Sequence, residues 1–261
     1  MGKRLGQHFL SDPAILDRIV RALDPHPDDH VIEIGPGKGT LTKRLAPVVG
    51  GVVAIERDDE LAAALDDSAI GHCRVVLGDA LNVDWRAELP PSVRRSSYKV
   101  AGNIPYAITT PLIDKALTEP LPAVIVFLVQ KEVGDRLESA PGSKTYGALS
   151  VGVQSVATVE RLFAVRAGSF RPPPQVDSVV VRITPFTDPL LTPDERRPFR
   201  RFVAGLFGER RKQLTRALRI VTGRNPDDLT GLLDQLGLNG RDRPEVLTPQ
   251  KIVDLFRVVR R

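Results

Sequence analysis

Residues 30–42 read HVIEIGPGKGTLT, and this stretch decides the fold. It begins with a short apolar run typical of a buried strand, and an amphipathic pattern typical of a helix follows over residues 40–48. Between the two stand Gly35, Gly37 and Gly39. Glycine lets a backbone turn sharply and approach a ligand where a Cβ atom would clash. The stretch therefore predicts a strand, a ligand-binding turn and a helix.

Apolar runs of strand length alternate with helical patterns on both sides of this stretch. Strands are expected at residues 30–35, 51–56, 73–80, 98–103 and 122–130, and two more β-rich runs at 159–167 and 176–186 flank a proline-rich segment. Such alternation is typical of a mostly parallel, Rossmann-like α/β sheet covered by helices. The two later runs are expected to close the sheet as an antiparallel pair.

The pattern changes to helices alone after Pro185. A stripe of Phe199, Phe202, Val203 and Leu206 predicts one amphipathic helix there. We therefore expect an α/β domain over residues 1–186 and a small all-α domain over residues 187–261.

Composition narrows the class of protein. With 261 residues and 42% hydrophobic content, the chain can bury a large core. The single cysteine, Cys73, excludes a disulfide framework and a cysteine-based zinc site, and no metal is indicated. No apolar run is long enough to cross a bilayer, and the N-terminus lacks the hydrophobic stretch of a signal peptide. We expect a cytoplasmic protein without a membrane partner.

The net charge of +5 is unevenly distributed. Residues 1–186 carry 21 basic and 22 acidic side chains, whereas residues 187–261 carry 16 basic and 10 acidic ones. The basic side chains are densest in GERRKQLTRALR, which contains Arg210, Arg211, Lys212 and Arg216. Such a cluster is what contact with nucleic-acid phosphates requires, and a solvated helix face is the alternative.

The glycine spacing limits the ligand. A dinucleotide-binding turn has G-x-G-x-x-G and a phosphate loop ends in G-K-[ST], whereas this turn is G-x-G-x-G with no hydroxyl residue directly after Lys38. A cofactor without a pyrophosphate is expected against Gly35 and Gly37. Glu56, at the end of the next strand, can accept hydrogen bonds from ribose hydroxyls. Asp79, next to Ala80 after the following strand, can accept one from an adenine amino group.

The strand at 98–103 ends in Asn103-Ile104-Pro105-Tyr106, which indicates the reaction. The amino lone pair of adenine is delocalised into its ring, so the nitrogen is a poor nucleophile. If the Asn103 side-chain oxygen and a backbone carbonyl near Pro105 accept its hydrogens, the lone pair is freed. Tyr106 can stack on a base that has left its helix. We therefore expect Asn103, Pro105 and Tyr106 to act in catalysis.

Motifs along nearly the whole chain support a family assignment. They are LGQHFL at 5–10, EIGPGKGTLT at 33–42, Glu56, GDAL at 78–81, NIPY at 103–106, QKEV at 130–133, YGALSV at 146–151, FRPPPQVDSVVV at 170–181 and RRK at 210–212. With them the chain resembles the ribosomal RNA adenine dimethyltransferase family, and in particular its bacterial small-subunit branch.

The resemblance implies a class I S-adenosylmethionine-dependent methyltransferase fold with a small helical C-terminal domain. It implies dimethylation of two neighbouring adenines near the 3′ end of small-subunit (16S) rRNA, so that the partners are ribosomal RNA and the small ribosomal subunit. The implied cofactor is S-adenosylmethionine, with contacts at His8, Leu10, Gly35, Glu56, Asp79 and Asn103. We expect the enzyme to act as a monomer.

Two alternatives remain open. One is the sister branch that methylates one adenine of large-subunit (23S) rRNA and confers macrolide resistance; Pro36, GDAL and VDS argue against it. The other is a non-catalytic ribosome assembly factor, against which Glu56, Asp79 and NIPY argue. The chain departs from its branch in having Ile104 for the usual leucine, and in QLTRAL after RRK. The sequence leaves the assembly state of the RNA substrate and the order of methylation undetermined.

Overall fold

The computed structural model describes residues 7–93 and 98–260, so Leu5 and Gly6 of the LGQHFL motif lie outside the described residues. The chain divides into two compact units. The first comprises Met1–Gly134 and Glu160–Pro185, and the second Asp135–Val159 and Phe186–Arg261. The second unit thus contains a segment, residues 135–159, that the sequence analysis assigned to the first domain.

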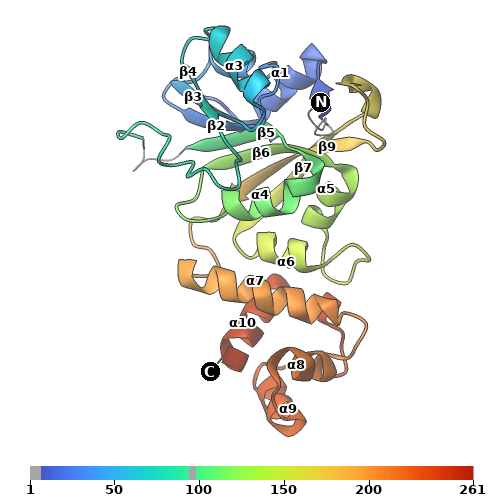
Figure 1. The fold of residues 1–261 in the computed structure, drawn as a ribbon. Coiled ribbons are helices and arrows are strands. Elements are labelled where there is room, and N and C mark those ends of the chain that lie inside the picture. Colours follow the sequence, from blue (N-terminus) through green and yellow to red (C-terminus); the bar gives the residue numbers. More distant parts are fainter. Residues whose placement is uncertain (1–6, 94–97, 261) are drawn as a thin grey trace. The chain divides into compact units, whose positions relative to one another are not determined.

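A seven-stranded sheet forms the centre of the first unit (Figure 1). Its strands are β2 (His30–Ile34), β3 (Gly51–Glu56), β4 (Cys73–Leu77), β5 (Lys99–Asn103), β6 (Val124–Gln130), β7 (Ala157–Val165) and β9 (Ser178–Pro185). They lie in the order β4-β3-β2-β5-β6-β9-β7. The first five strands in this order, β4, β3, β2, β5 and β6, are parallel to one another. Strand β9 is antiparallel to β6. The predicted mostly parallel sheet is confirmed.

Helices cover both faces of the sheet, with α1 and α3 on one face and α4 on the other (Figure 1). The helices are α1 (Pro13–Ala22), α2 (Thr42–Leu45), α3 (Asp59–Asp67), α4 (Thr109–Ala116) and α5 (Lys131–Glu138). Strand β6 is central and completely buried along most of its length, as its apolar sequence predicts. Alternate residues of a strand point to opposite faces, so Leu128 packs in the cluster that contains Leu16 while Phe127 faces the other layer.

A two-stranded ribbon joins distant parts of the first unit. Strand β1 (Phe9–Leu10) pairs antiparallel with β8 (Phe170–Arg171), which follows the short 3-10 helix η2 (Ala167–Ser169). The N-terminal motif therefore lies beside the proline-rich segment. Helix α1 then begins at Pro13, where the Asp12 carboxylate accepts hydrogen bonds from the N–H groups of Ala14 and Ile15.

The second unit is helical. Its helices are α6 (Ala148–Gln154), α7 (Pro193–Gly208), α8 (Leu214–Thr222), α9 (Pro226–Gln235), the 3-10 helix η3 (Pro244–Val246) and α10 (Pro249–Arg260). The rings of Phe199 and Phe202 lie 5.4 and 5.7 Å from that of Phe256 in α10, so the predicted apolar stripe of α7 forms part of the core. The Tyr146 hydroxyl donates to the Leu247 carbonyl, which ties residues 135–159 to the C-terminal helices.

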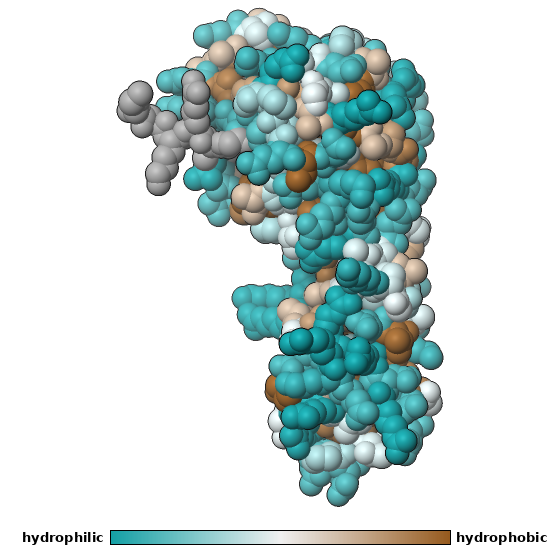
Figure 2. Space-filling model, turned by 90° about the vertical axis from the view of Figure 1, so that its right-hand side faces the viewer, coloured by the Kyte–Doolittle hydropathy of each residue, from teal (hydrophilic) through white to brown (hydrophobic). Residues whose placement is uncertain are grey.

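On the face drawn in Figure 2, apolar side chains lie among polar ones. The large exposed ones are Val48, Leu77, Val176, Ile220 and Val246. Among residues 7–93 and 98–260, no helix has the length and apolar character to span a membrane.

Candidate active site

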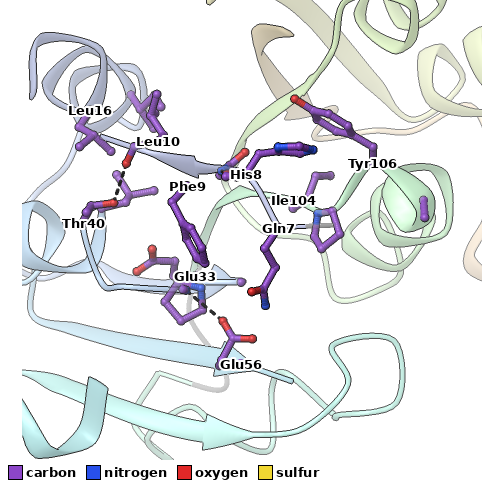
Figure 3. Close-up of a pocket in the computed structure, with 18 residues that line it drawn as sticks. Gln7, His8, Phe9, Leu10, Leu16, Glu33, Thr40, Glu56, Ile104 and Tyr106 are labelled. Atoms are coloured by element: carbon purple, nitrogen blue, oxygen red, sulfur yellow. Dashed lines mark hydrogen bonds between the residues drawn. The ribbon is translucent and has the colours of Figure 1, made fainter. Parts of the chain in front are cut away.

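A cavity of about 530 Å³ opens at the carboxyl ends of the parallel strands in the first unit. Eight residues singled out from the sequence line it: His8, Leu10, Gly35, Gly37, Glu56, Asn103, Pro105 and Tyr106. Glu56 lies at one end and Tyr106 at the other, with Phe9 between them (Figure 3). We call the region of Glu33, Gly35, Gly37 and Glu56 the glycine end, and that of His8, Asn103 and Tyr106 the tyrosine end.

The turn after β2 has the left-handed backbone that its glycines permit. The φ angles of Gly35, Gly37 and Gly39 are 65°, 56° and 72°. A Cβ atom on Gly37 would lie 2.9 Å from Cε1 of Phe9, closer than real Cβ contacts come. A larger residue at position 37 would therefore strain this left-handed turn and displace the Phe9 ring.

Glu56 holds this turn from the end of the neighbouring strand β3. Its Oε2 accepts a hydrogen bond of 3.0 Å from the Gly37 N–H, and its Oε1 accepts from the N–H groups of Arg57 and Asp58 at 2.8 and 3.0 Å. The side chain is 5% exposed and lines the cavity. A carboxylate has about four lone-pair sites, so three backbone donors leave capacity for a ligand hydroxyl.

Glu33 is a second acidic side chain at the glycine end, and the sequence pattern predicted no role for it. It lies in β2, is 2% exposed, and its Oε2 has no hydrogen-bond partner among the described residues. Burial raises the pKa of Glu33 to about 7, and the negative charge of Glu56 adds to the effect. A buried carboxyl on the wall of a cavity marks a place for a cationic or hydrogen-bonding ligand. The sequence did contain a signal for such a role, namely an acidic residue inside the otherwise apolar strand HVIEI.

The Asn103 amide is oriented by the N-terminal segment. Its Nδ2 donates a hydrogen bond of 2.8 Å to the His8 carbonyl. Because a carbonyl can only accept, the amide nitrogen must face His8, and Oδ1 is left as the acceptor of this side chain. Asn103 ends β5, so the strand and the β1 segment together fix its direction.

Tyr106 lies in the 3-10 helix η1 (Tyr106–Ile108) and faces His8 across the tyrosine end. The two rings are 5.9 Å apart between centroids and inclined by 27°. The Tyr106 hydroxyl lies 2.7 Å from Oγ of Ser178, and burial raises the pKa of the phenol, which keeps it neutral. His8 Nδ1 lies 2.9 Å from the Pro172 carbonyl; because a carbonyl can only accept, Nδ1 carries a proton and donates this hydrogen bond.

The Pro105 carbonyl is already engaged in the turn. It accepts from the Ile108 N–H at 3.1 Å and from the Thr109 hydroxyl at 3.3 Å. This carbonyl therefore already has two donors, and the neighbouring Ile104 lines the same cavity.

Asp79 and Ala80 do not line the cavity, unlike the other residues expected to contact a cofactor. They follow β4, and Asp79 accepts from the Leu81 N–H at 2.9 Å and lies 3.8 Å from the Arg57 guanidinium. The Ala80 carbonyl accepts from the Trp85 indole at 2.8 Å. Lys115 of α4 donates to the carbonyls of Leu81 and Val83, so it fixes this loop from a distant helix.

The four cations proposed for RNA differ in their surroundings. Arg210 makes two hydrogen bonds to Glu245, at 2.9 and 2.7 Å, and one to the Lys144 carbonyl. Lys212 pairs with Glu209 at 2.5 Å. Arg211 and Arg216 are exposed, and no ion pair joins either of them to another described residue. In the described parts of the chain there is also no group of three or more acidic, histidine or cysteine side chains that could hold a metal ion.

Comparisons with known proteins agree with this geometry. The sequence profile of the family described as "Ribosomal RNA adenine dimethylase" matches residues 1–260. A "Ribosomal RNA small subunit methyltransferase A" from Xanthomonas campestris pv. campestris is 44% identical over 222 residues, which cover 84% of this chain and 83% of that protein. The corresponding protein of Xanthomonas axonopodis pv. citri is 43% identical over the same share.

Solved structures show the same fold. A dimethyladenosine transferase from Plasmodium falciparum superposes with a TM-score of 0.80 at 26% identity, covering 95% of this chain and 96% of that one. The 23S rRNA methyltransferase ErmE superposes with a TM-score of 0.72 at 26% identity, covering 97% and 100%. The predicted class I methyltransferase fold is confirmed. Since the family profile spans the chain, the protein belongs to the ribosomal RNA adenine dimethylase family and is a methyltransferase.

Proposed function

We propose that this chain transfers methyl groups from S-adenosylmethionine to the N6 atoms of two adjacent adenines near the 3′ end of 16S rRNA. The observation that carries the proposal is a single cavity with two different ends. Glu56 and the glycine turn lie at one end, and Tyr106 lies at the other with Asn103, whose amide is oriented by the His8 carbonyl. Relatives that cover four fifths of the chain bear the name of a small-subunit methyltransferase, which favours this substrate over 23S rRNA. ErmE shares the fold, so fold similarity does not distinguish the two branches.

The glycine end suits the proposed cofactor. S-adenosylmethionine carries a sulfonium and an ammonium charge, and it supplies a methyl group activated by the sulfonium. Glu56 offers negative charge there, the buried carboxyl of Glu33 offers a further acceptor, and Gly35 and Gly37 allow close approach of the backbone. Glu56 accepts from the ribose. We assign Asp79 and Ala80 to the adenine of the cofactor, at the strand end next to Glu56.

The N-terminal segment completes this proposed binding site. His8 and Leu10 line the cavity, and the Thr40 hydroxyl donates to the Leu10 carbonyl at 3.1 Å. This bond ties β1 to the residues after the glycine turn. His8 and Leu10 bind the cofactor in this proposal, and the residues after the glycine turn help to hold their segment in place.

The tyrosine end receives the adenine. Asn103 Oδ1 and the backbone carbonyl of Ile104, next to Pro105, accept the two hydrogens of the amino group, which draws its nitrogen toward tetrahedral geometry. Tyr106 stacks on the extruded base. The remaining contribution is orientation of the amino group for in-line attack on the methyl group. The nitrogen gives up one proton to solvent in the first transfer. It then has one hydrogen left, so it must rotate before the second transfer.

The second unit supplies phosphate contacts. We propose an RNA-binding role for residues 187–261, in which Arg211 and Arg216 contact phosphates directly. Arg210 and Lys212, whose charges are paired within the unit, act by shaping this surface. The enzyme works as a monomer in the cytoplasm, where ribosomal subunits are assembled.

Methyl transfer to purified ribosomal particles tests the proposal. Small subunits from cells lacking this activity are incubated with the enzyme and tritiated S-adenosylmethionine, and modified bases are located by nuclease digestion and nucleoside mass spectrometry. Two adjacent dimethyladenosines near the 3′ end of 16S rRNA are expected. Naked 23S rRNA is the matched control substrate. Methylation of 23S rRNA alone would assign the enzyme to the sister branch, and no transfer to either RNA would favour an assembly factor.

A further inference from the structure

The proline-rich segment between β8 and β9 comprises residues 172–177. Its first residue, Pro172, and the residue that follows the segment, Ser178, both contact the tyrosine end of the cavity. At its start, the Pro172 carbonyl accepts from His8 Nδ1. Just beyond its end, the Ser178 hydroxyl shares a 2.7 Å hydrogen bond with the Tyr106 hydroxyl. Pro172 and Ser178 thus each contact one of the two rings that face each other in the cavity.

Ser178 is held by the central sheet. It is completely buried, begins β9 and pairs in register with Gln130 at the end of β6. The residue before it is fixed as well, because the Asp177 carbonyl accepts from the Lys131 N–H at 3.0 Å and its side chain from the Ala167 N–H at 2.9 Å. The Ser178 oxygen is therefore a rigid anchor.

The Tyr106 side chain is less constrained than that of Ser178. Its backbone belongs to a three-residue 3-10 helix, and one side of its ring borders the cavity. The ring can turn about two side-chain torsions, and the Ser178 bond is the one hydrogen bond of its hydroxyl within the described residues. That bond fixes the far end of the ring and keeps it within 27° of the plane of His8.

We propose that Ser178 is a positioning residue for adenine methylation. Its hydroxyl holds the Tyr106 ring in the plane that supports the extruded base, and so aligns the amino group with the methyl donor. The inference rests on the proposed stacking role of Tyr106. Ser178 lies outside the cavity wall, so it acts through Tyr106 alone.

The positioning role predicts a specific kinetic pattern. In Ser178→Ala the Tyr106 ring can still stack on the base, so RNA binding persists. The ring is no longer held in one plane, so the adenine amino group is less well aligned with the methyl donor. A hydrogen bond of ordinary net strength corresponds to a change of about threefold to tenfold. We expect kcat to fall by this factor, with KM for RNA and cofactor affinity within about twofold of wild type.

The experiment compares Ser178→Ala, Tyr106→Phe, the double variant and Tyr106→Ala with wild type. Ser155→Ala is the matched control, because Ser155 is also completely buried and donates its hydroxyl hydrogen bond to the Gly152 carbonyl. Methyl transfer to small subunits gives kcat and KM, calorimetry gives cofactor affinity, and thermal unfolding reports stability. Tyr106→Phe keeps the ring and loses the same bond, so it decides the matter if Ser178→Ala does not fold.

Coupling between the two hydroxyls is the decisive result. Both single variants should lose kcat, the double variant should lose no more than the worse single one, and Ser155→Ala should keep wild-type kcat. If Ser178→Ala and Tyr106→Phe both retain kcat while Tyr106→Ala is inactive, the positioning role is wrong and the proposed function stands. A rise in KM for RNA without a loss of kcat also overturns it. Wild-type kinetics in Tyr106→Ala would remove the stacking role itself.

Discussion

The two ends of the cavity are built differently. The glycine end comes from neighbouring parallel strands: Glu33 and the glycine turn belong to β2 and its loop, and Glu56 ends β3. The tyrosine end combines segments far apart in the sequence, because His8 contacts Asn103 and Pro172, and Tyr106 contacts Ser178. The glycine end thus depends on a local strand-turn-strand pattern, whereas the tyrosine end depends on the tertiary fold.

Asn103→Ala should produce the largest effect, at the tyrosine end. The change removes the acceptor for the amino group and the bond to His8, and loss of one oriented polar group in an active site costs about 10² to 10³ in rate. We expect kcat to fall at least about hundredfold in single-turnover methyl transfer at saturating cofactor. RNA affinity should change little.

Asn82→Ala is the control for this variant, since Asn82 is exposed and outside the cavity. A loss of less than about tenfold in Asn103→Ala would mean that the amide does not act on the reacting nitrogen, because removal of such a group should cost far more.

Glu33→Gln tests the electrostatics of the glycine end. The pKa of Glu33 in the folded protein is about 7, above the ordinary value of 4.5. The folded state therefore holds the extra proton, and stability falls as the pH rises from about 4.5 to 7. The full shift corresponds to about 3 kcal/mol in the free energy of unfolding.

Urea unfolding at pH 5 and pH 8 measures this difference. Without cofactor, wild type should lose about 3 kcal/mol more than Glu33→Gln between the two pH values, because glutamine does not titrate. Equal losses in the two proteins would show that Glu33 is ionised in the folded state throughout this range.

Glu56→Gln should weaken cofactor binding by about tenfold to hundredfold, since a charged acceptor of a hydrogen bond contributes about 1.5 to 3 kcal/mol. Glutamine keeps the size of the side chain but offers one oxygen where the carboxylate uses both. Calorimetry with S-adenosylmethionine measures the change, and Glu60→Gln on the exposed face of α3 is the control. An affinity within threefold of wild type would remove Glu56 from the ribose site.

The smallest effect is expected in the second unit. Replacing Arg211 and Arg216 by glutamine should weaken RNA binding about tenfold at moderate salt and reduce the slope of log affinity against log salt by nearly two. The paired cations Arg210 and Lys212, changed in the same way, are the matched control and should mainly lower stability. If the slope of log affinity against log salt were equal in the two double variants, ion pairing within the second unit would not decide which cations contact phosphates.

The sequence alone predicted what depends on local pattern. The strand-turn-helix at residues 30–42, the parallel sheet and the buried stripe of α7 follow from hydrophobic periodicity and glycine spacing, which act within a few residues. Eight of the residues expected to contact cofactor or base line one cavity for the same reason, since the carboxyl ends of parallel strands meet at one edge.

Only the tertiary structure decided which side chains meet across long separations. Residues 135–159 belong with the C-terminal helices because Tyr146 is buried there and bonded to Leu247, a contact that no local pattern encodes. Whether a cation is free or paired depended likewise on Glu245, far from Arg210 in sequence. The Ser178–Tyr106 bond joins residues brought together by the register of β6 and β9, and a hydrogen bond forms only within a few tenths of an ångström of its preferred distance.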